Sequence, residues 1–490
     1  MPADLRVVAV DLGATSGRVM VGSVGAGRLG LEEVHRFANG PVTAADGSLR
    51  WDVQRLYDEM LVGLRAAAAD GPVHGIGIDS WAVDHGLLDQ HGRLLEQPWC
   101  YRDPRTDKVV EAVLRRVPEE ELFMVTGLQQ LPFNTLYQLA ASAPLLARAE
   151  TMLLLPDLLG YWLTGRVGAE LTNASTTQLL DVRSRTWATG LAEQVGIPAR
   201  LLPPLRAPGT VLGPLLPVVA RSVGLPEDTP VVAVGSHDTA SAVVGVPFGP
   251  GGQASYISSG TWSLVGLELD GPVLSEDARR ANFTNEGGVD GTIRFLRNVM
   301  GLWVLSETMR AWGESDVAAV LAAAEAAPAF GAVVDVDGAE FLAPGDMEGR
   351  IAAACRATGQ VPPATRGEVA RCVLESLALS YRRALRQASA LAGVRPQVVH
   401  VVGGGARNAL LCRLTADATG LPVLAGPVEA AALGNVLVQA RALGADLPDL
   451  GAMRALLRDT CDLVRYEPAR DASAWDAAEA RLSGTTVVRG

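Results

Sequence analysis

The sequence predicts an α/β protein that is built from more than one domain. Short β-branched strands alternate with segments of helical period in the first part of the chain, which is typical of layered α/β folds. A strand–turn–strand pattern at 7–22 recurs in form, although not in letters, at 254–268, and this suggests two similar halves. The length of 490 residues is too great for one hydrophobic core and agrees with roughly two to four domains.

The N-terminal part predicts four short strands and one helix. The apolar run "LRVVAVDLG" ends at Asp11–Gly13, and "SGRVMVGSV" follows it as a second strand. The helical period of "WDVQRLYDEMLVGLRAAAAD" predicts a helix that begins near Asp52 and ends at Gly71. The stretch "GIGIDSWAVDHGLLDQHGRLL" indicates two strands around a charged corner, with "DQHG" as a turn.

The rest of the chain continues this pattern after a middle that is rich in loops. An apolar strand at 230–234 leads into "GSHDTASA", and the glycines and prolines of 246–252 favour a domain boundary. A long amphipathic helix is predicted at 368–391, followed by the strand and glycine run of "VVHVVGGGARN". We therefore expect an N-terminal domain at 1–246, a C-terminal domain at 247–445 and a peripheral segment at 446–490.

The composition is that of a soluble globular protein and argues against several partners. Hydrophobic residues make up 48% and charged residues 20%, and the formal net charge is −12. An acidic chain lacks the basic face that nucleic acid or an anionic membrane requires, so we expect neither as a partner. The N-terminal letters do not form a secretory signal, and the uncharged stretch 122–146 is too polar to span a membrane, so we expect a cytoplasmic protein.

The five cysteines do not predict a metal site. No CxxC spacing occurs, which disfavours zinc. Cys372 falls on the apolar stripe of the helix predicted at 368–391 and is most simply a small buried hydrophobe. Whether Cys355 and Cys372 form a disulfide stays open, because this depends on how their elements pack.

Three small-residue loops could hold phosphate. In "DLGATSGR" the backbone N–H groups of a tight turn converge, and Thr15, Ser16 and Arg18 add donors. Asp11, at the end of its strand, could hold a Mg²⁺-bound water, although a plain hairpin would have the same letters. "SSGTWS" offers Gly260 for close approach and Thr261 as a hydroxyl.

The third loop, "GGGARN", follows a strand and opens a helix. Three consecutive glycines cost conformational entropy, so a flat ligand packed against the backbone explains them better than stability does. The chain has no GxxxxGK[ST] motif and no convincing GxGxxG motif, which argues against a P-loop and a Rossmann dehydrogenase.

Asp238 in "GSHDTASA" has two interpretations. A hydroxyl that attacks a γ-phosphate must give up its proton, and a carboxylate at a strand end beside His237 suits that task. Alternatively, Asp238 is the N-cap of the helix that starts at "TASAVVG". The phosphate-binding character of the other loops favours the general base.

Taken together, these motifs resemble the FGGY carbohydrate kinases. The resemblance is carried by "AVDLGATSGR", "GIDSWAVD", "GSHDTASA", "SSGTWSL", "VVGGGARN" and "GPVEAAALGN", and it extends from about residue 5 to residue 445. It implies two actin-like (ribonuclease H-like) ATPase domains with a nucleotide and sugar cleft between them. Further phrases, "LPFNTLYQL", "NFTNEGGVDG" and "RNVMGLW", are similar to those of the subgroup that uses Mg²⁺ and ATP to phosphorylate L-rhamnulose on its 1-hydroxyl.

The resemblance also implies a role for individual residues. It makes Asp238 the catalytic base, with a sugar site formed by Trp81, Ala82, Asp84, His237, Thr239 and Asn298. ATP and its Mg²⁺ would be bound by Asp11, Ala14, Thr15, Ser16, Gly17, Arg18, Gly260, Thr261, Ser306, Gly403, Gly404 and Asn408. Two positions depart from the family: Ala82 replaces a glycine near the sugar, and Ser306 replaces a longer amide that reaches the nucleotide.

Two other functions stay open at this point. A kinase for another ketose, such as L-fuculose or D-xylulose, differs only in the shape of the sugar pocket. A non-catalytic actin-like protein that binds ATP and sugar would need the same loops, but it would not need a base at Asp238. For either kinase we expect a monomer or a homodimer.

Overall fold

The computed structural model describes residues 4–251, 254–469 and 472–482. The chain forms two compact units, and each draws on separate stretches of sequence. The first unit comprises Met1–Pro250, Glu268–Phe295 and Ala430–Thr460, and the second comprises Gly251–Leu267, Leu296–Glu429 and Cys461–Gly490. The last part of the expected boundary, 252, and the end of the expected peripheral segment, 483–490, lie outside the described residues.

The first unit is built on a six-stranded sheet in the order β13-β14-β6-β1-β2-β3. Strands β1, β6 and β14 run parallel to one another, and β2, β3 and β13 are antiparallel to their neighbours. The bounds are β1 Leu5–Leu12, β2 Ser16–Gly25, β3 Arg28–Ala38, β6 Gly75–Ser80, β13 Val211–Pro214 and β14 Pro230–Val232. The strand expected at 230–234 therefore ends two residues earlier.

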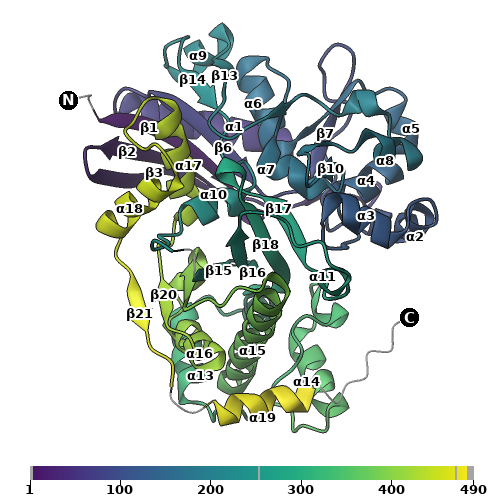
Figure 1. The fold of residues 1–490 in the computed structure, drawn as a ribbon, viewed down its shortest axis with the longest axis vertical. Coiled ribbons are helices and arrows are strands. Elements are labelled where there is room, and N and C mark those ends of the chain that lie inside the picture. The colour runs from purple at the N-terminus through teal and green to yellow at the C-terminus, as the bar shows by residue number, and fades with distance from the viewer. Residues whose placement is uncertain (1–3, 252–253, 470–471, 483–490) are drawn as a thin grey trace. The chain divides into compact units, whose positions relative to one another are not determined.

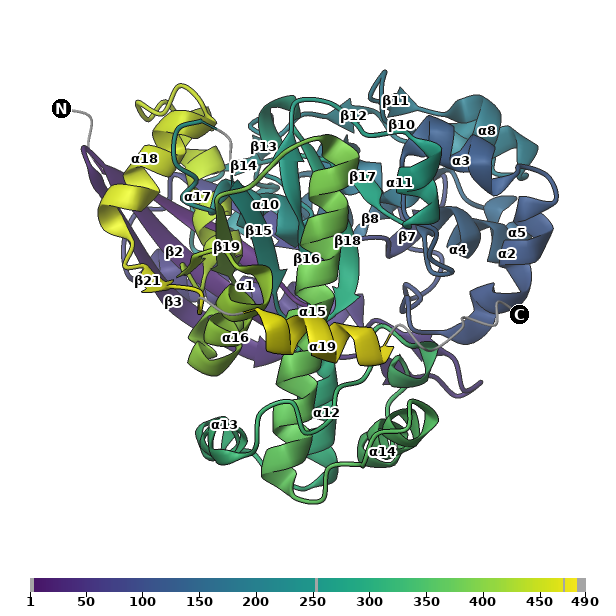
Figure 2. The same ribbon diagram turned by 60° about the horizontal axis from the view of Figure 1, so that its bottom comes forward.

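Helices cover both faces of this sheet. Side chains alternate along a strand, so Val19 and Gly22 of β2 face opposite sides. Val19 packs on α1 (Val53–Ala69), whereas Gly22 leaves room for Val436 of α17 (Ala430–Ala442). Figures 1 and 2 show both helices against β1–β3. Asp52 caps α1 through the N–H of Arg55, which confirms the helix start read from the sequence.

A helical region and a small two-stranded sheet complete the first unit. The pair β7 (His85–Leu88) and β8 (Thr151–Leu154) packs with short helices around buried side chains such as Leu136, Tyr137 and Met152. The remaining helices are α2 Asp107–Leu114, α3 Glu119–Thr126, α4 Thr135–Ala141, α5 Ala143–Leu146, α6 Leu155–Thr164, α7 Leu171–Ala174, α8 Thr189–Gln194, α9 Pro217–Val223, α10 Asp238–Val244, α11 Glu276–Arg280 and α18 Leu450–Thr460. The remaining strands are β4 Val42–Thr43, β5 Leu49–Arg50, β9 Ala169–Glu170, β10 Leu180–Asp181, β11 Thr186–Trp187, β12 Leu205–Arg206 and β17 Thr284–Gly287.

The second unit repeats the strand arrangement of the first. Strand β15 pairs antiparallel with β16 and parallel with β19, as β1 does with β2 and β6. The bounds are β15 Ala254–Ser259, β16 Trp262–Leu269, β18 Ile293–Met300, β19 Val398–Val402, β20 Val423–Ala425 and β21 Val464–Tyr466. The two similar halves suggested by 7–22 and 254–268 thus correspond to two strand–turn–strand units with the same pairing.

The long helix α15 (Arg366–Ala392) is the centre of the second unit. It begins with a capping box between Thr365 and Glu368 and ends at Gly393, close to the expected bounds of 368–391. Figure 2 shows α12 and α13 beside it. The other helices are α12 Trp303–Ala311, α13 Val317–Ala326, α14 Met347–Ala357, α16 Ala409–Thr419 and α19 Ser473–Leu482. Cys372 is buried in this core, as expected, and both it and Cys355 are free thiols. Within the described residues, we find no helix with the length and apolar character of a membrane span.

Candidate active site

In the first unit, three parallel strands end at one edge of the sheet, and acidic residues lie at the ends of two of them and in the segment that follows the third. Asp11 of β1 lies in register with Asp79 of β6, and Ser80 forms a bridge with His237, next to Asp238. Ligands of open α/β sheets bind outside the carboxyl ends of parallel strands. This topology explains why a carboxylate follows the apolar strand β14.

The first phosphate loop is a tight turn between β1 and β2. The N–H of Gly13 donates to the carbonyl of Ser16 at 2.9 Å, and Thr15 is exposed at the tip. Packing explains the glycine at position 17, because a Cβ there would lie 2.2 Å from the ring of Phe37. The Arg18 guanidinium donates to Asp11 Oδ2 at 2.7 Å, so in this structure Arg18 and Asp11 form an ion pair.

Asp79 was not singled out from the sequence, although it lies in the motif "GIDSWAVD". It is fully buried, and its Oδ2 accepts a hydrogen bond from Asn435 Nδ2 at 2.6 Å. Burial, reinforced by the carboxylate of Asp11, holds the pKa of Asp79 well above its usual range. Its Oδ1 has no hydrogen-bond partner among the described residues.

Asp238 is the first residue of α10 and not its N-cap. The N-cap is His237, whose side chain makes no capping bond, and the carbonyl of His237 accepts the N–H of Ala240 at 2.7 Å. The Asp238 side chain is 32% exposed. Thr239 Oγ1 donates to Asp238 Oδ1 at 3.1 Å, and His237 Nε2 lies 3.5 Å from the same oxygen. Within the described part of the chain, Oδ2 has no partner, so one carboxylate oxygen is available to accept a proton.

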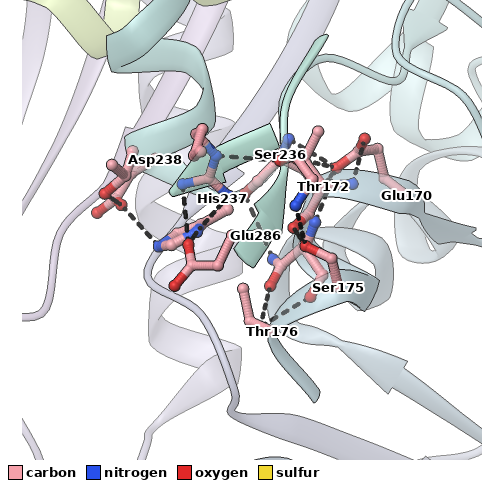
Figure 3. Close-up of polar contacts among 12 residues, drawn as sticks. Glu170, Thr172, Ser175, Thr176, Ser236, His237, Asp238 and Glu286 are labelled. Atoms are coloured by element: carbon pink, nitrogen blue, oxygen red, sulfur yellow. Dashed lines mark hydrogen bonds and ion pairs between the residues drawn. The ribbon is translucent and has the colours of Figure 1, made fainter. Parts of the chain in front are cut away.

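The loop that precedes Asp238 is held by a buried carboxylate, Glu170. Glu170 Oε2 accepts the backbone N–H of Ser236 at 3.0 Å and its hydroxyl at 2.9 Å. The same carboxylate caps α7 by accepting the N–H groups of Thr172 and Asn173 (Figure 3). Burial raises the pKa of Glu170, while the hydrogen bonds of Thr172 and Ser236 oppose this shift. Glu170 therefore connects α7 to the loop of the proposed base.

On its other side, His237 contacts a buried ion pair. Its Nδ1 lies 3.1 Å from Arg294 Nη2 and 3.3 Å from Glu286 Oε2, and Arg294 Nη1 lies 3.0 Å from Glu286 Oε2. Burial acts to raise the pKa of Glu286, but the charge of the neighbouring Arg294 opposes it, and the pKa is lowered. Figure 3 shows the ring of His237 between Asp238 and Glu286.

The corner at Trp81–Asp84 is an ordered cluster of indoles and a carboxylate. Asp84 accepts Trp51 Nε1 at 2.6 Å, Trp81 Nε1 at 3.0 Å, Gln138 Nε2 at 2.8 Å and the Tyr101 N–H at 3.2 Å. Burial raises the pKa of Asp84 to about 6 against the effect of these bonds. In this structure Asp84 thus orients the two tryptophans.

The same corner holds an unusual backbone conformation. Val83 has a φ of 66°, in the left-handed region that β-branched residues avoid. Its carbonyl accepts Thr135 Oγ1 at 2.7 Å. Strain of this kind concentrates at functional sites. The strained residue is Val83. Ala82 does not have a positive φ, so its methyl group is not held in a strained backbone position.

In the second unit, the turn of "SSGTWS" supports the start of α12. The carbonyls of Gly260 and Thr261 accept the N–H groups of Leu302 and Trp303 at 3.0 and 3.2 Å. A Cβ at Gly301 would lie 2.6–2.7 Å from this turn, which explains the glycine of "NVMGLW". The two expected ligand residues of this segment, Asn298 on β18 and Ser306 on α12, are half-buried and exposed, respectively.

The glycine run lies between β19 and α16, and its members differ. Gly403 has a φ of 81°, and a Cβ there would lie 2.9 Å from the carbonyl oxygen of Ser259. A Cβ at Gly405 would lie 2.0 Å from Ser259 Oγ, whereas a Cβ at Gly404 would meet nothing within 4 Å. Asn408 Oδ1 caps α16 by accepting the N–H of Leu411 at 2.9 Å. Packing therefore explains Gly403 and Gly405 but leaves Gly404 free for contact with a ligand.

The sequence reasoning missed several side chains that position this site. They are Trp51, Asp79, Glu170, Glu286, Arg294 and Asn435. The sequence contained a signal for Asp79 and Glu286, since each is a charged residue within a motif of apolar or small residues. A charge that is buried in such a segment needs a partner. No group of three or more metal-ligating side chains occurs in the described ranges.

These features identify the family. Residues 6–245 match the N-terminal domain of the FGGY family of carbohydrate kinases, and residues 255–443 match its C-terminal domain. The chain therefore belongs to the FGGY family of carbohydrate kinases, which are phosphotransferases that use ATP and Mg²⁺ and have an alcohol group as the acceptor. Two proteins named rhamnulokinase are among its relatives. That of Bacteroides thetaiotaomicron is 42% identical and covers 96% of this chain and 97% of its own length, and that of Enterococcus faecalis is 44% identical and covers 94% of each.

Solved structures confirm the two-domain actin-like fold. The ligand-bound xylulose kinase of Lactobacillus acidophilus has a TM-score of 0.79 at 17% identity and covers 97% of this chain and 96% of its own. The glycerol kinase of Plasmodium falciparum with ADP has a TM-score of 0.76 at 14% identity and covers 99% of both chains. At these identities the likeness concerns the fold.

Proposed function

We propose that this enzyme transfers the γ-phosphoryl group of ATP to the 1-hydroxyl of L-rhamnulose and forms L-rhamnulose 1-phosphate. The single observation that carries the choice of sugar is the similarity, over nearly the whole chain, to proteins named rhamnulokinase. The half-exposed Asp238, with a free carboxylate oxygen at the carboxyl ends of parallel strands, supports the chemistry.

In the proposed step, Asp238 Oδ2 accepts the proton of the sugar hydroxyl while the hydroxyl oxygen attacks the γ-phosphorus. The bond between the γ-phosphorus and the β,γ-bridging oxygen breaks, and ADP leaves. Thr239 Oγ1 donates to Oδ1 and keeps it in place, which leaves Oδ2 as the base. Glu170 orients the loop through Ser236.

We assign the binding of ATP to the loop Ala14–Arg18, to Gly260 and Thr261, to Ser306, and to the glycine run at Gly403 and Gly404 with Asn408. Mg²⁺ usually keeps several waters and takes one or two carboxylates together with substrate phosphates, so the lack of a cluster of ligands among the described residues agrees with this metal. Asp11 would hold it through water, next to the unpartnered Oδ1 of Asp79. When bound, Mg²⁺ neutralises the charge of the phosphates.

The sugar site of the proposal contains Trp81, Ala82, Asp84, His237, Thr239 and Asn298. A kinase for another ketose remains the second candidate, because only the pocket shape separates such sugars. We further propose that the enzyme is a monomer or a homodimer, and that it works in the cytoplasm, where its substrate ATP is made and used.

The test is ADP release from the full chain with Mg-ATP and a panel of acceptors: L-rhamnulose, L-fuculose, D-xylulose, L-ribulose and glycerol. We expect the highest kcat/KM for L-rhamnulose. Preference for another ketose would keep the mechanism and overturn the assigned sugar. Binding of ATP without any release of ADP that depends on sugar would favour a non-catalytic binder. Light scattering of the same sample measures the oligomeric state.

A further inference from the structure

Arg294 is a fully buried guanidinium close to the proposed base. Its side chain is 0% exposed and makes three kinds of contact. Nε donates to the carbonyl of Gly287 at 3.0 Å, Nη1 lies 3.0 Å from Glu286 Oε2, and Nη2 lies 3.1 Å from His237 Nδ1. A buried cation is costly unless it is paired and hydrogen-bonded, so these contacts determine where the guanidinium lies.

The contact between Arg294 and His237 determines which ring nitrogen has the proton. A guanidinium has only N–H donors and keeps its charge in proteins. The His237 nitrogen that faces it, Nδ1, must therefore be the acceptor. A neutral imidazole that accepts at Nδ1 has its proton on Nε2.

Glu286 is the competing influence, because its Oε2 lies 3.3 Å from the same Nδ1 and would favour a proton there. A proton on Nδ1 would face Arg294 Nη2, which lies 3.1 Å from Nδ1, so that two donors would be in contact. The Glu286 carboxylate already has a closer cation in Arg294, at 3.0 Å. The arrangement therefore favours Arg294 as donor to Nδ1 and Glu286 as the counter-ion of Arg294.

We propose that Arg294, held by Glu286, is a positioning residue that acts through His237 and sets the proton of this histidine on Nε2. The Nε2–H then donates to an oxygen of the ketose, next to the hydroxyl that Asp238 deprotonates. Nε2 is the ring nitrogen on the side of Asp238, 3.5 Å from Oδ1, which places this donor beside the base. The proposal takes its substrate class from the proposed function, whereas the protonation state follows from the contacts that Arg294 and Glu286 make with the ring.

The protonation state is measured without any substrate. Long-range ¹H–¹⁵N NMR of the full chain labelled in its six histidines distinguishes protonated from unprotonated ring nitrogens. The signal of His237 is the one lost in His237→Gln. At pH 7.5 we expect Nδ1 without a proton and Nε2 with one. A proton on Nδ1, alone or together with one on Nε2, would overturn the proposal.

The second experiment separates positioning from structure. The double variant Arg294→Met/Glu286→Gln removes both charges, so neither is left buried alone. We expect the KM for the ketose to rise ~10–100-fold, because one oriented hydrogen bond to the sugar is lost. The KM for Mg-ATP should be unchanged, and His237 should show a mixed protonation state. Arg294→Lys keeps a cationic donor and should restore the Nε2–H state and most of the affinity for the sugar.

A matched control removes another buried ion pair of the first unit. Arg454 Nη1 lies 2.8 Å from Glu268 Oε2, and Arg454 also donates to the carbonyl of Val243 in α10. Arg454→Met/Glu268→Gln should leave the KM for the ketose within about twofold. An equal rise in both double variants, or none in the first, would overturn the proposal. If no ketose is phosphorylated by the unaltered protein while His237 shows the Nε2–H state, the proposed function fails and the role of Arg294 in protonation stands.

Discussion

Glu170 and Ser236, which lie 66 residues apart in the sequence, are joined by two hydrogen bonds to a single carboxylate oxygen. The backbone N–H and the hydroxyl of Ser236 both donate to Glu170 Oε2, which also accepts from α7. Every group that contacts the Glu170 carboxylate in these bonds is a hydrogen-bond donor. The site therefore requires a carboxylate, which only accepts, and tolerates no amide in its place. The loop that presents His237 and Asp238 is thus held by a group from a distant segment.

Glu170→Gln tests this connection. An amide group places N–H donors against the donors of Ser236 or Thr172 whichever way it is turned, so we expect a loss of about 2–3 kcal/mol in the free energy of unfolding. We also expect a lower kcat, because the loop of Asp238 is no longer held. Chemical denaturation and steady-state kinetics measure both effects. Ser236→Ala, which removes one bond and keeps the other, should cost about 1 kcal/mol; equal effects of the two variants would contradict this account.

Asp238→Asn tests the general base. The amide keeps the shape of the side chain but cannot accept a proton, so kcat should fall ~10²–10⁴-fold. Binding of Mg-ATP, measured by calorimetry, should be unchanged, since the proposed role concerns only the sugar hydroxyl. A normal turnover number would show that another group takes the proton.

Asp84 should make stability depend on pH. Its pKa is about 6 in the folded protein and 3.8 in the unfolded chain, so the folded state binds more protons between these values and its stability falls as the pH rises through them. The loss amounts to about 2–3 kcal/mol between pH 4 and pH 7. Free energies of unfolding of the unaltered protein and of Asp84→Asn at both pH values measure it. Between pH 4 and pH 7, the free energy of unfolding of the unaltered protein should fall relative to that of Asp84→Asn. A difference between the two proteins that does not vary with pH would refute the prediction.

The glycine run allows a comparison of neighbours. Gly404→Ala meets no atom within 4 Å, so the free energy of unfolding should stay within about 0.5 kcal/mol of the original. If adenosine packs against this glycine, the KM for Mg-ATP should rise ~5–100-fold through overpacking. Gly403→Ala serves as the control, because its φ of 81° and the carbonyl oxygen of Ser259 2.9 Å away predict a loss of stability. An unchanged KM in Gly404→Ala would remove Gly404 from the nucleotide site.

Local patterns were enough for the two longest helices, α1 and α15, and for the class of protein. Helix α1 follows from Asp52 and its helical period, and α15 from the apolar stripe of 368–391, because caps and helical period depend on residues a few positions apart. The motifs around Asp11, Asp238 and Gly404 were enough to name the family for the same reason. Each is a short loop with its own small residues.

The partners of the functional groups depended on the tertiary structure. The sequence left Asp238 as either a base or an N-cap, and the backbone of α10 shows that His237 is the N-cap. Nothing local connects Glu170 to Ser236 or Arg294 to His237, because these contacts depend on strand order and on the path of the loops. The sequence by itself determined the fold class, the long helices α1 and α15 and the motifs around Asp11, Asp238 and Gly404. Only the tertiary structure decided which buried charges face one another, since a hydrogen bond requires an approach to about 3 Å that no spacing in the chain predicts.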